Sequence, residues 1–169
     1  SIDGVLNAHK ANRLFGSGMI DFAGSGVVHA TGGLTALIAT KVLGPRSDRF
    51  HDDLGNPLHT PNPIQSYSVS LQVLGTFLLW FGWYGFNAGS VHFVATSEYA
   101  SLAALSALTT TLGVASGTIT SLGASALWAQ RTTGEVKFEV PNALNGCLSG
   151  LVGVTGGCAM IEPWAALLI

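Results

Sequence analysis

The chain has 169 residues, of which 48% are apolar and only 9% are charged, and its formal net charge is −2. Soluble domains carry about a quarter charged residues, so this composition argues against an ordinary soluble fold. The sequence has no basic patch, which argues against nucleic acid as a partner.

Long uncharged stretches indicate four membrane spans. Each stretch meets or approaches the roughly 20 residues that a helix needs to cross a bilayer. A soluble bundle of buried helices is the alternative, but soluble helices need a polar face and these stretches lack one. We therefore expect an all-α membrane protein, a polytopic transmembrane helix bundle, with spans at about 20–42, 67–91, 99–129 and 141–161.

The first expected span contains two ionisable residues, Asp21 and His29. An ionisable residue inside a span usually faces the protein interior or a pore, so we favour a functional role for His29 over that of a hydrogen-bonded core histidine. Asp21 stands at the expected helix start, where a carboxylate can cap free N–H groups. An outer carboxylate would also attract a cation. Eight residues of helix would place both side chains on broadly the same side.

Charged loops separate the expected spans and indicate their orientation. Five Lys and Arg residues lie in or beside the loops 44–66 and 131–139, whereas the other side has only Lys10 and Arg13. Basic residues favour the cytoplasmic side, so we place these two loops in the cytoplasm. The chain starts without Met and ends within an apolar run, and we expect it to be an internal part of a longer protein.

The second expected span carries a stripe on one helical face. Spacings of four, three and four residues align Leu79, Trp83, Phe86 and Ser90. Such a stripe could pack against a neighbouring helix. It could equally form a pore wall, because an aromatic face attracts a cation and a serine hydroxyl can accept a hydrogen bond. The spacing alone does not choose between these interpretations.

The later spans carry small residues and both cysteines. We interpret the GxxxG spacings as tight helix packing; they occur at Gly85/Gly89, Gly113/Gly117, Gly146/Gly150 and Gly153/Gly157. On one helix, Cys147 and Cys158 would be about 16 Å apart, too far for a disulfide. The pattern contains no metal site, and we expect no metal and no cofactor.

Three motifs carry a family resemblance. The run from Asp21 to His29 (DFAGSGVVH), the run Gly82–Ser90 (GWYGFNAGS) and the run Asn145–Thr155 (NGCLSGLVGVT) resemble, in order and spacing, the signatures of the ammonium transporter (Amt/Mep/Rh) family. The residues of these motifs are more similar to the Amt branch of the family than to the Rh branch. The resemblance covers essentially the whole chain and implies a fold of the ammonium transporter type, of which this chain would be a fragment.

The resemblance implies an architecture and site roles. Members have eleven spans with the N-terminus outside and form homotrimers with one pore per subunit, and this chain would supply spans five to eight. His29 resembles a pore histidine, Asp21 the aspartate below an outer recruitment site, and Phe86 a gating phenylalanine. Ser90 resembles the serine that hydrogen-bonds the recruited ion, and Trp83 and Leu79 resemble the pore wall beneath. The second pore histidine and the remaining outer-site aromatic residues would belong to other spans.

The implied function is transmembrane transport of ammonium or ammonia, with recruitment at an outer site and passage of ammonia through a hydrophobic, His-lined pore. The expected setting is the plasma membrane, and the chain is not expected to be an enzyme, because no bond in an organic substrate is broken. Three alternatives stay open: an ammonium sensor that conducts little, a neutral-gas channel of Rh type, and a purely structural membrane bundle.

Overall fold

The computed structural model describes residues 18–52, 54–63 and 67–169. Within these residues the structure is helical, with isolated bridges such as that between His51 and Pro57. The elements in order are η2 (Ser25–Ala30), a π-helical segment that runs into α1 (Thr31–Leu43), then α2 (Val69–Gly89), α3 (Ser97–Thr133), α4 (Val140–Thr155) and α5 (Pro163–Ala166). The expected all-α class is confirmed. The N-terminal loop with Lys10 and Arg13 lies outside the described residues.

Among the described residues, three helical stretches are long and apolar enough to cross a membrane: Ser25–Leu43 (η2 with α1), Val69–Gly89 and Ser97–Thr133. The third has 37 residues, which corresponds to about 55 Å of helix and exceeds the roughly 30 Å of a hydrocarbon core. The fourth helix, α4, has only 16 residues. It ends well before residue 161, where sequence analysis placed the end of the last span.

The first helix begins later than residue 20. Gly24 has φ 97°, a left-handed conformation that glycine adopts without steric cost, and it separates η2 from the non-helical residues before it. Those residues pack on the end of α4, where the amide of Phe22 donates to the carbonyl of Gly156 at 2.7 Å and that of Ala23 to Thr155 at 3.3 Å. The carbonyls at a helix C-terminus lack partners within the helix, and here residues 22 and 23 supply them.

The closest helix contact is the seam between α3 and α4. A Cβ at Gly117 would lie 2.5 Å from the carbonyl oxygen of Gly146, and a Cβ at Gly150 would collide with the carbonyl of Gly113. These glycines therefore let the two backbones touch, as expected for small residues at helix contacts. Hydroxyls on α3 add bonds along the seam: Ser121 donates to the carbonyl of Asn142 at 2.7 Å.

The expected tight packing of the GxxxG pairs is confirmed for this seam and stays a prediction for the pair in α2. A Cβ at Gly85 or Gly89 would meet no other atom within 4 Å among the described residues. The spacing is the same in both cases, but only α3 and α4 present their glycines to each other.

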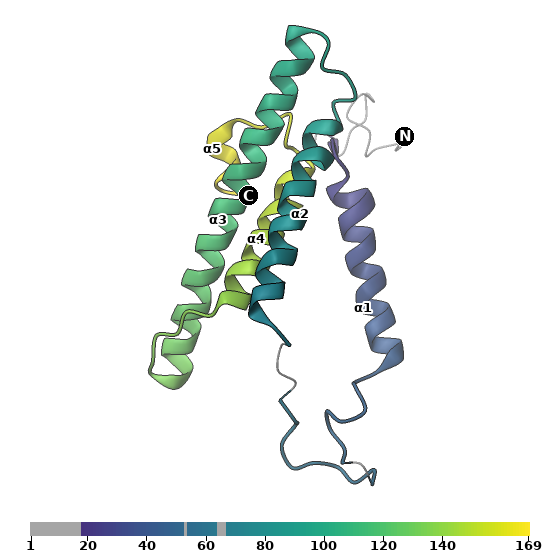
Figure 1. The fold of residues 1–169 in the computed structure, drawn as a ribbon, viewed down its shortest axis with the longest axis vertical. Coiled ribbons are helices and arrows are strands. Elements are labelled where there is room, and N and C mark those ends of the chain that lie inside the picture. The colour runs from purple at the N-terminus through teal and green to yellow at the C-terminus, as the bar shows by residue number, and fades with distance from the viewer. Residues whose placement is uncertain (1–17, 53, 64–66) are drawn as a thin grey trace.

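The core lies among α2, α3 and α4, whereas α1 stands apart from them (Figure 1). Val114, Cys147 and Leu151 form its centre, and none of the residues of α1 is buried. Both cysteines are buried and free. The sequence placed them on one helix, but Cys158 lies beyond the end of α4.

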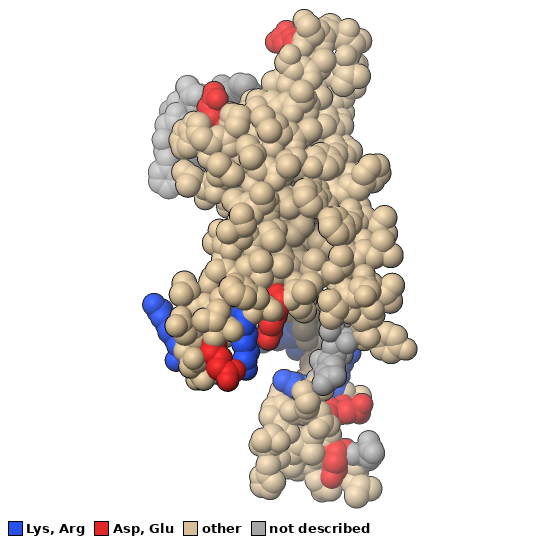
Figure 2. Space-filling model, turned by 60° about the vertical axis from the view of Figure 1, so that its left-hand side comes forward, with Lys and Arg blue, Asp and Glu red and all other residues tan. Residues whose placement is uncertain are grey.

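Basic side chains gather at one end of the molecule. In the view of Figure 2 the blue Lys and Arg atoms lie at the lower end, and the middle is free of charged groups. The described basic residues belong to the last turns of α1 and α3 and to the connections that follow them: Lys41, Arg46, Arg49, Arg131 and Lys137.

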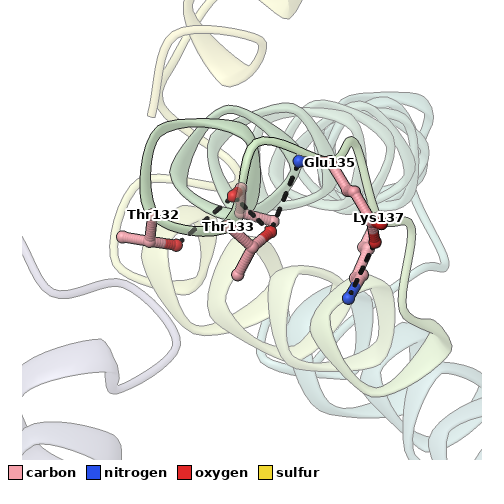
Figure 3. A network of polar contacts seen from close by, with 5 residues as sticks. Thr132, Thr133, Glu135 and Lys137 are labelled. Atoms are coloured by element: carbon pink, nitrogen blue, oxygen red, sulfur yellow. Dashed lines mark hydrogen bonds and ion pairs between the residues drawn. The ribbon is translucent and has the colours of Figure 1, made fainter.

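The connection between α3 and α4 is a short polar turn at this charged end (Figure 3). Thr133 Oγ1 donates to the carbonyl of Ala129 at 2.8 Å and accepts from the amide of Glu135 at 3.4 Å. Lys137 Nζ lies 3.2 Å from a carboxylate oxygen of Glu135.

Candidate functional site

His29 lies in the π-helical segment η2, at the junction with α1. Its amide donates to the carbonyl of Gly24, five residues earlier, at 3.3 Å, which is the spacing of a π-turn. Single π-turns are frequent at functional sites because they change the direction of a side chain relative to the regular helix. The local backbone thus sets His29 apart from the residues of α1.

Asp21 caps this segment from outside the helix. Its Oδ2 accepts from the amides of Gly26 at 3.0 Å and Val27 at 2.9 Å. The capping role expected for Asp21 is therefore confirmed. The expectation that Asp21 and His29 share one helix is wrong, because the chain before Gly24 is not helical. A cation-attracting role for Asp21 stays a prediction.

Three aromatic rings from two helices meet beside this cap. The imidazole of His29 stacks on the indole of Trp83, with centroids 4.7 Å apart and an interplanar angle of 24°. The ring of Phe86 lies 5.3 Å from His29 and 6.0 Å from Trp83. The structure thus brings together three of the six residues that the sequence singled out, from segments more than 50 residues apart. We call His29, Trp83 and Phe86 the ring cluster.

The ring cluster has a buried polar atom without a hydrogen-bond partner among the described residues. This atom is His29 Nε2. An imidazole nitrogen can donate or accept according to its tautomer, so a small molecule that reaches the cluster could bond to it. The surrounding faces are apolar and aromatic, and an aromatic face attracts a cation.

Ser90 and Leu79 lie one helical turn from the ring cluster, on either side of it along α2. The hydroxyl of Ser90 donates to the carbonyl of Phe86 at 2.7 Å, so its lone pairs remain able to accept. Leu79 borders a different space, a cavity of about 350 Å³ between α2 and α4 that Gln72 and Asn145 also line. The structure therefore places both residues on the expected stripe, outside the ring cluster.

Sequence analysis missed the residue that holds the indole in the ring cluster. Trp83 Nε1 donates to Thr155 Oγ1 at 2.8 Å, across 72 residues. Thr155 closes the third sequence motif, and a hydroxyl at the end of an otherwise apolar motif is the signal that could have found it. Asn87 was also missed: it is fully buried and donates to Thr110 Oγ1 at 2.9 Å.

Comparisons with known proteins agree on one family. A family model described as Ammonium Transporter Family matches residues 2–169. Ammonium transporter 1 member 2 of Arabidopsis thaliana is 43% identical to the chain over 178 residues, covering 99% of the chain and 32% of the relative. Ammonium transporter Amt2 of Archaeoglobus fulgidus is 40% identical over 154 residues, covering 91% of the chain and 30% of the relative.

A solved structure gives the same picture for the fold. The crystal structure of Saccharomyces cerevisiae Mep2 matches with a TM-score of 0.68 at 31% sequence identity, covering 90% of this chain and 32% of that one. The chain spans about a third of the length of the relatives that it matches.

Proposed function

The chain belongs to the ammonium transporter family, and from this premise we propose that the protein moves ammonium or ammonia across a membrane along a path bordered by the ring cluster. The family expected from the three sequence motifs is thereby confirmed. Transport itself is a proposal for this chain, because the chain covers only part of its relatives.

The observation that carries the proposal is a histidine ring that stacks on Trp83 and lies beside Phe86. His29 is half-buried, its Nε2 has no partner in the part of the chain that the structure describes, and Trp83 and Phe86 contact its ring. A histidine that only stabilised a helix contact would use its ring nitrogens in that contact. An unpaired nitrogen beside aromatic faces is instead suited to a small ligand that both donates and accepts.

Ammonium would first meet Phe86 and Ser90 at the end of α2. The face of Phe86 attracts the cation, and the hydroxyl of Ser90 has lone pairs for an N–H group because its own proton is bonded to Phe86. The carboxylate of Asp21 adds negative charge nearby, although two backbone amides already share it.

The molecule that continues past the ring cluster would be neutral ammonia. A bare ion in a medium of low dielectric costs on the order of tens of kcal/mol, whereas a small neutral polar molecule costs only a few. Ammonium would therefore transfer its proton to water at the outer end of the path, before the apolar stretch. The ammonia that remains would form a hydrogen bond with His29 Nε2. Trp83 and Leu79 would border the path beneath.

The proposed orientation follows from the charged end of the molecule. The basic residues of the α1–α2 and α3–α4 connections would face the cytoplasm, since such residues favour that side. The Phe86 end of α2 would then face outward. We extend the proposal to a multi-pass protein of the plasma membrane that assembles as a homotrimer, as the family resemblance implies.

Uptake of the ammonium analogue methylammonium tests this proposal. Cells would express the full-length protein as wild type, His29→Ala or Phe86→Ala, with Phe81→Ala as the matched control. Phe81 is an exposed phenylalanine of the same helix outside the ring cluster. We expect ammonium to compete with methylammonium uptake by the wild type. Uptake should change in His29→Ala and Phe86→Ala and should equal that of the wild type in Phe81→Ala.

The outcomes also separate the alternatives. Ammonium binding without uptake, with the protein intact at the surface, would favour a sensor. Passage of another small neutral gas without ammonium dependence would favour a channel of Rh type. His29→Ala acting on stability alone would favour a structural bundle.

A further inference from the structure

The C-terminal end of α4 holds the indole of the ring cluster through a single hydroxyl. Thr155 is fully buried. Its Oγ1 donates to the carbonyl of Leu151 at 2.6 Å and accepts from Trp83 Nε1 at 2.8 Å. An indole nitrogen can only donate and a hydroxyl has one proton. The bond to Leu151 therefore turns a lone pair of Thr155 toward the indole.

The same end of α4 also holds the segment that carries His29. Ser25 Oγ donates to the carbonyl of Val152 at 2.7 Å, and the amides of Phe22 and Ala23 donate to Gly156 and Thr155. Asp21, which caps η2, lies so close to Gly156 that a Cβ there would be 3.3 Å from its Oδ1. Both partners of the ring stack are thus positioned by residues 152–156.

A neighbouring tryptophan shows that this arrangement is specific to the ring cluster. Trp80, three residues before Trp83 on α2, has a buried Nε1 with no hydrogen-bond partner among the described residues. Trp80 and Trp83 both pack on the hydrophobic core, and the His29 ring stacks on Trp83. The tryptophan that stacks on the histidine is the one whose indole is anchored.

We propose that Thr155 is a positioning residue that sets the stack of Trp83 on His29 and thereby keeps hydrated cations out of the path. This inference rests on the proposed transport function. Without the hydroxyl, the buried indole N–H loses its hydrogen-bond partner. Rotation of the indole toward another acceptor would then lower the free energy of the protein. Rotation would separate the Trp83 ring from His29 and admit water beside His29. The free-energy barrier for a hydrated cation such as K⁺ would then be lower.

The test is the variant Thr155→Val, which keeps the shape of the side chain and removes the hydroxyl. We expect methylammonium uptake per surface protein to fall roughly tenfold, together with a new K⁺ leak. Thr155→Ser, which restores the acceptor, is expected to recover most of both properties. The matched control is Thr118→Val, because Thr118 makes the same backbone bond within α3, to Val114 at 2.7 Å, and anchors no indole.

A double-variant cycle links the effect to the indole. Trp83→Phe removes the indole donor, so Thr155→Val should change uptake and K⁺ leak little further in that background. If the two residues acted independently, the effects of the two substitutions would add. The K⁺ leak is a readout that loss of folded protein alone would not produce.

The results distinguish the inference from the function on which it rests. Wild-type protein at the surface with no ammonium-competed uptake would overturn both. Wild-type uptake with an unchanged Thr155→Val variant would overturn the inference alone. Full additivity in the cycle, or a loss of surface protein with normal uptake per molecule, would also overturn it and reduce Thr155 to a structural residue.

Discussion

The α3–α4 seam and the surroundings of α1 are held by different kinds of contact. In the seam, backbone lies against backbone, and a Cβ at Gly117, Gly146 or Gly150 would collide with the opposite helix. By contrast, α1 has no buried residue. The η2 segment before it is held by a few directed hydrogen bonds to Asp21 and the end of α4.

This difference distinguishes the α3–α4 seam, which acts as a scaffold, from the η2 segment, which carries His29. Close packing tolerates no added volume, because neighbouring atoms have nowhere to move. Individual hydrogen bonds contribute about 1 kcal/mol each and can be lost one at a time. The seam is therefore the rigid part of the structure, and the position of His29 depends on the hydrogen bonds that join η2 to it.

The largest expected effect comes from filling the seam. Gly150→Leu would place side-chain atoms against the carbonyl of Gly113 and should destabilise the protein by about 3 kcal/mol or more. The measurement is the thermal unfolding of the purified full-length protein in detergent. Gly123→Leu is the control, since a Cβ there meets no atom of the described residues within 4 Å. Equal melting temperatures for the two variants would contradict a close-packed seam.

A smaller effect is expected from removing the cap of η2. Asp21→Ala deletes the acceptor for the amides of Gly26 and Val27, at a cost of about 1–2 kcal/mol. Hydrogen exchange should show faster exchange of residues 25–31, with the seam unchanged. Asp21→Asn keeps an acceptor oxygen and should lose less. Unchanged exchange of these amides in Asp21→Ala would mean that other contacts hold η2.

The ion pair at the end of the seam should matter least for stability. Glu135 and Lys137 are exposed, with 71% and 52% of their side-chain surfaces accessible. Glu135→Ala should therefore change the free energy of unfolding by less than about 0.5 kcal/mol, in low and in high salt. A loss above about 1 kcal/mol would show that the polar turn in Figure 3 contributes to the seam.

The loop after α1 offers a pH test with only a local effect. The side chain of Asn56, followed by its backbone amide, holds the pKa of Asp52 below its usual value. A depressed carboxyl pKa gives stability that is present above the unfolded pKa of about 3.9 and is lost as pH falls through the folded pKa. The turn at Asp52 should therefore persist down to about pH 4 and open only below it.

Carboxyl titration by NMR checks this prediction. Asn56→Ala removes the first of these donors and should raise the pKa of Asp52 toward its usual value. An unchanged titration curve in this variant would mean that Asn56 is not the cause.

The sequence by itself determined the class of the protein and its family. Uncharged stretches and clustered basic residues are local properties of the chain, and they were enough to predict a helical membrane bundle. Three motifs were enough to identify the family. The stripe of α2 followed from helical periodicity, which is also local. The pore roles of its residues stay proposals.

The tertiary structure decided which of these features meet. Among the described residues, equal GxxxG spacings make a close helix contact in α3 and α4 but not in α2, because packing depends on what lies opposite. Asp21 lies outside the helix and α4 ends at Thr155, because residues 22 and 23 bond to the end of α4 more than 120 positions along the chain. The bond from Trp83 to Thr155 spans 72 residues. Periodicity describes neighbours within one helix, whereas these contacts join separate helices, so the fold alone places them.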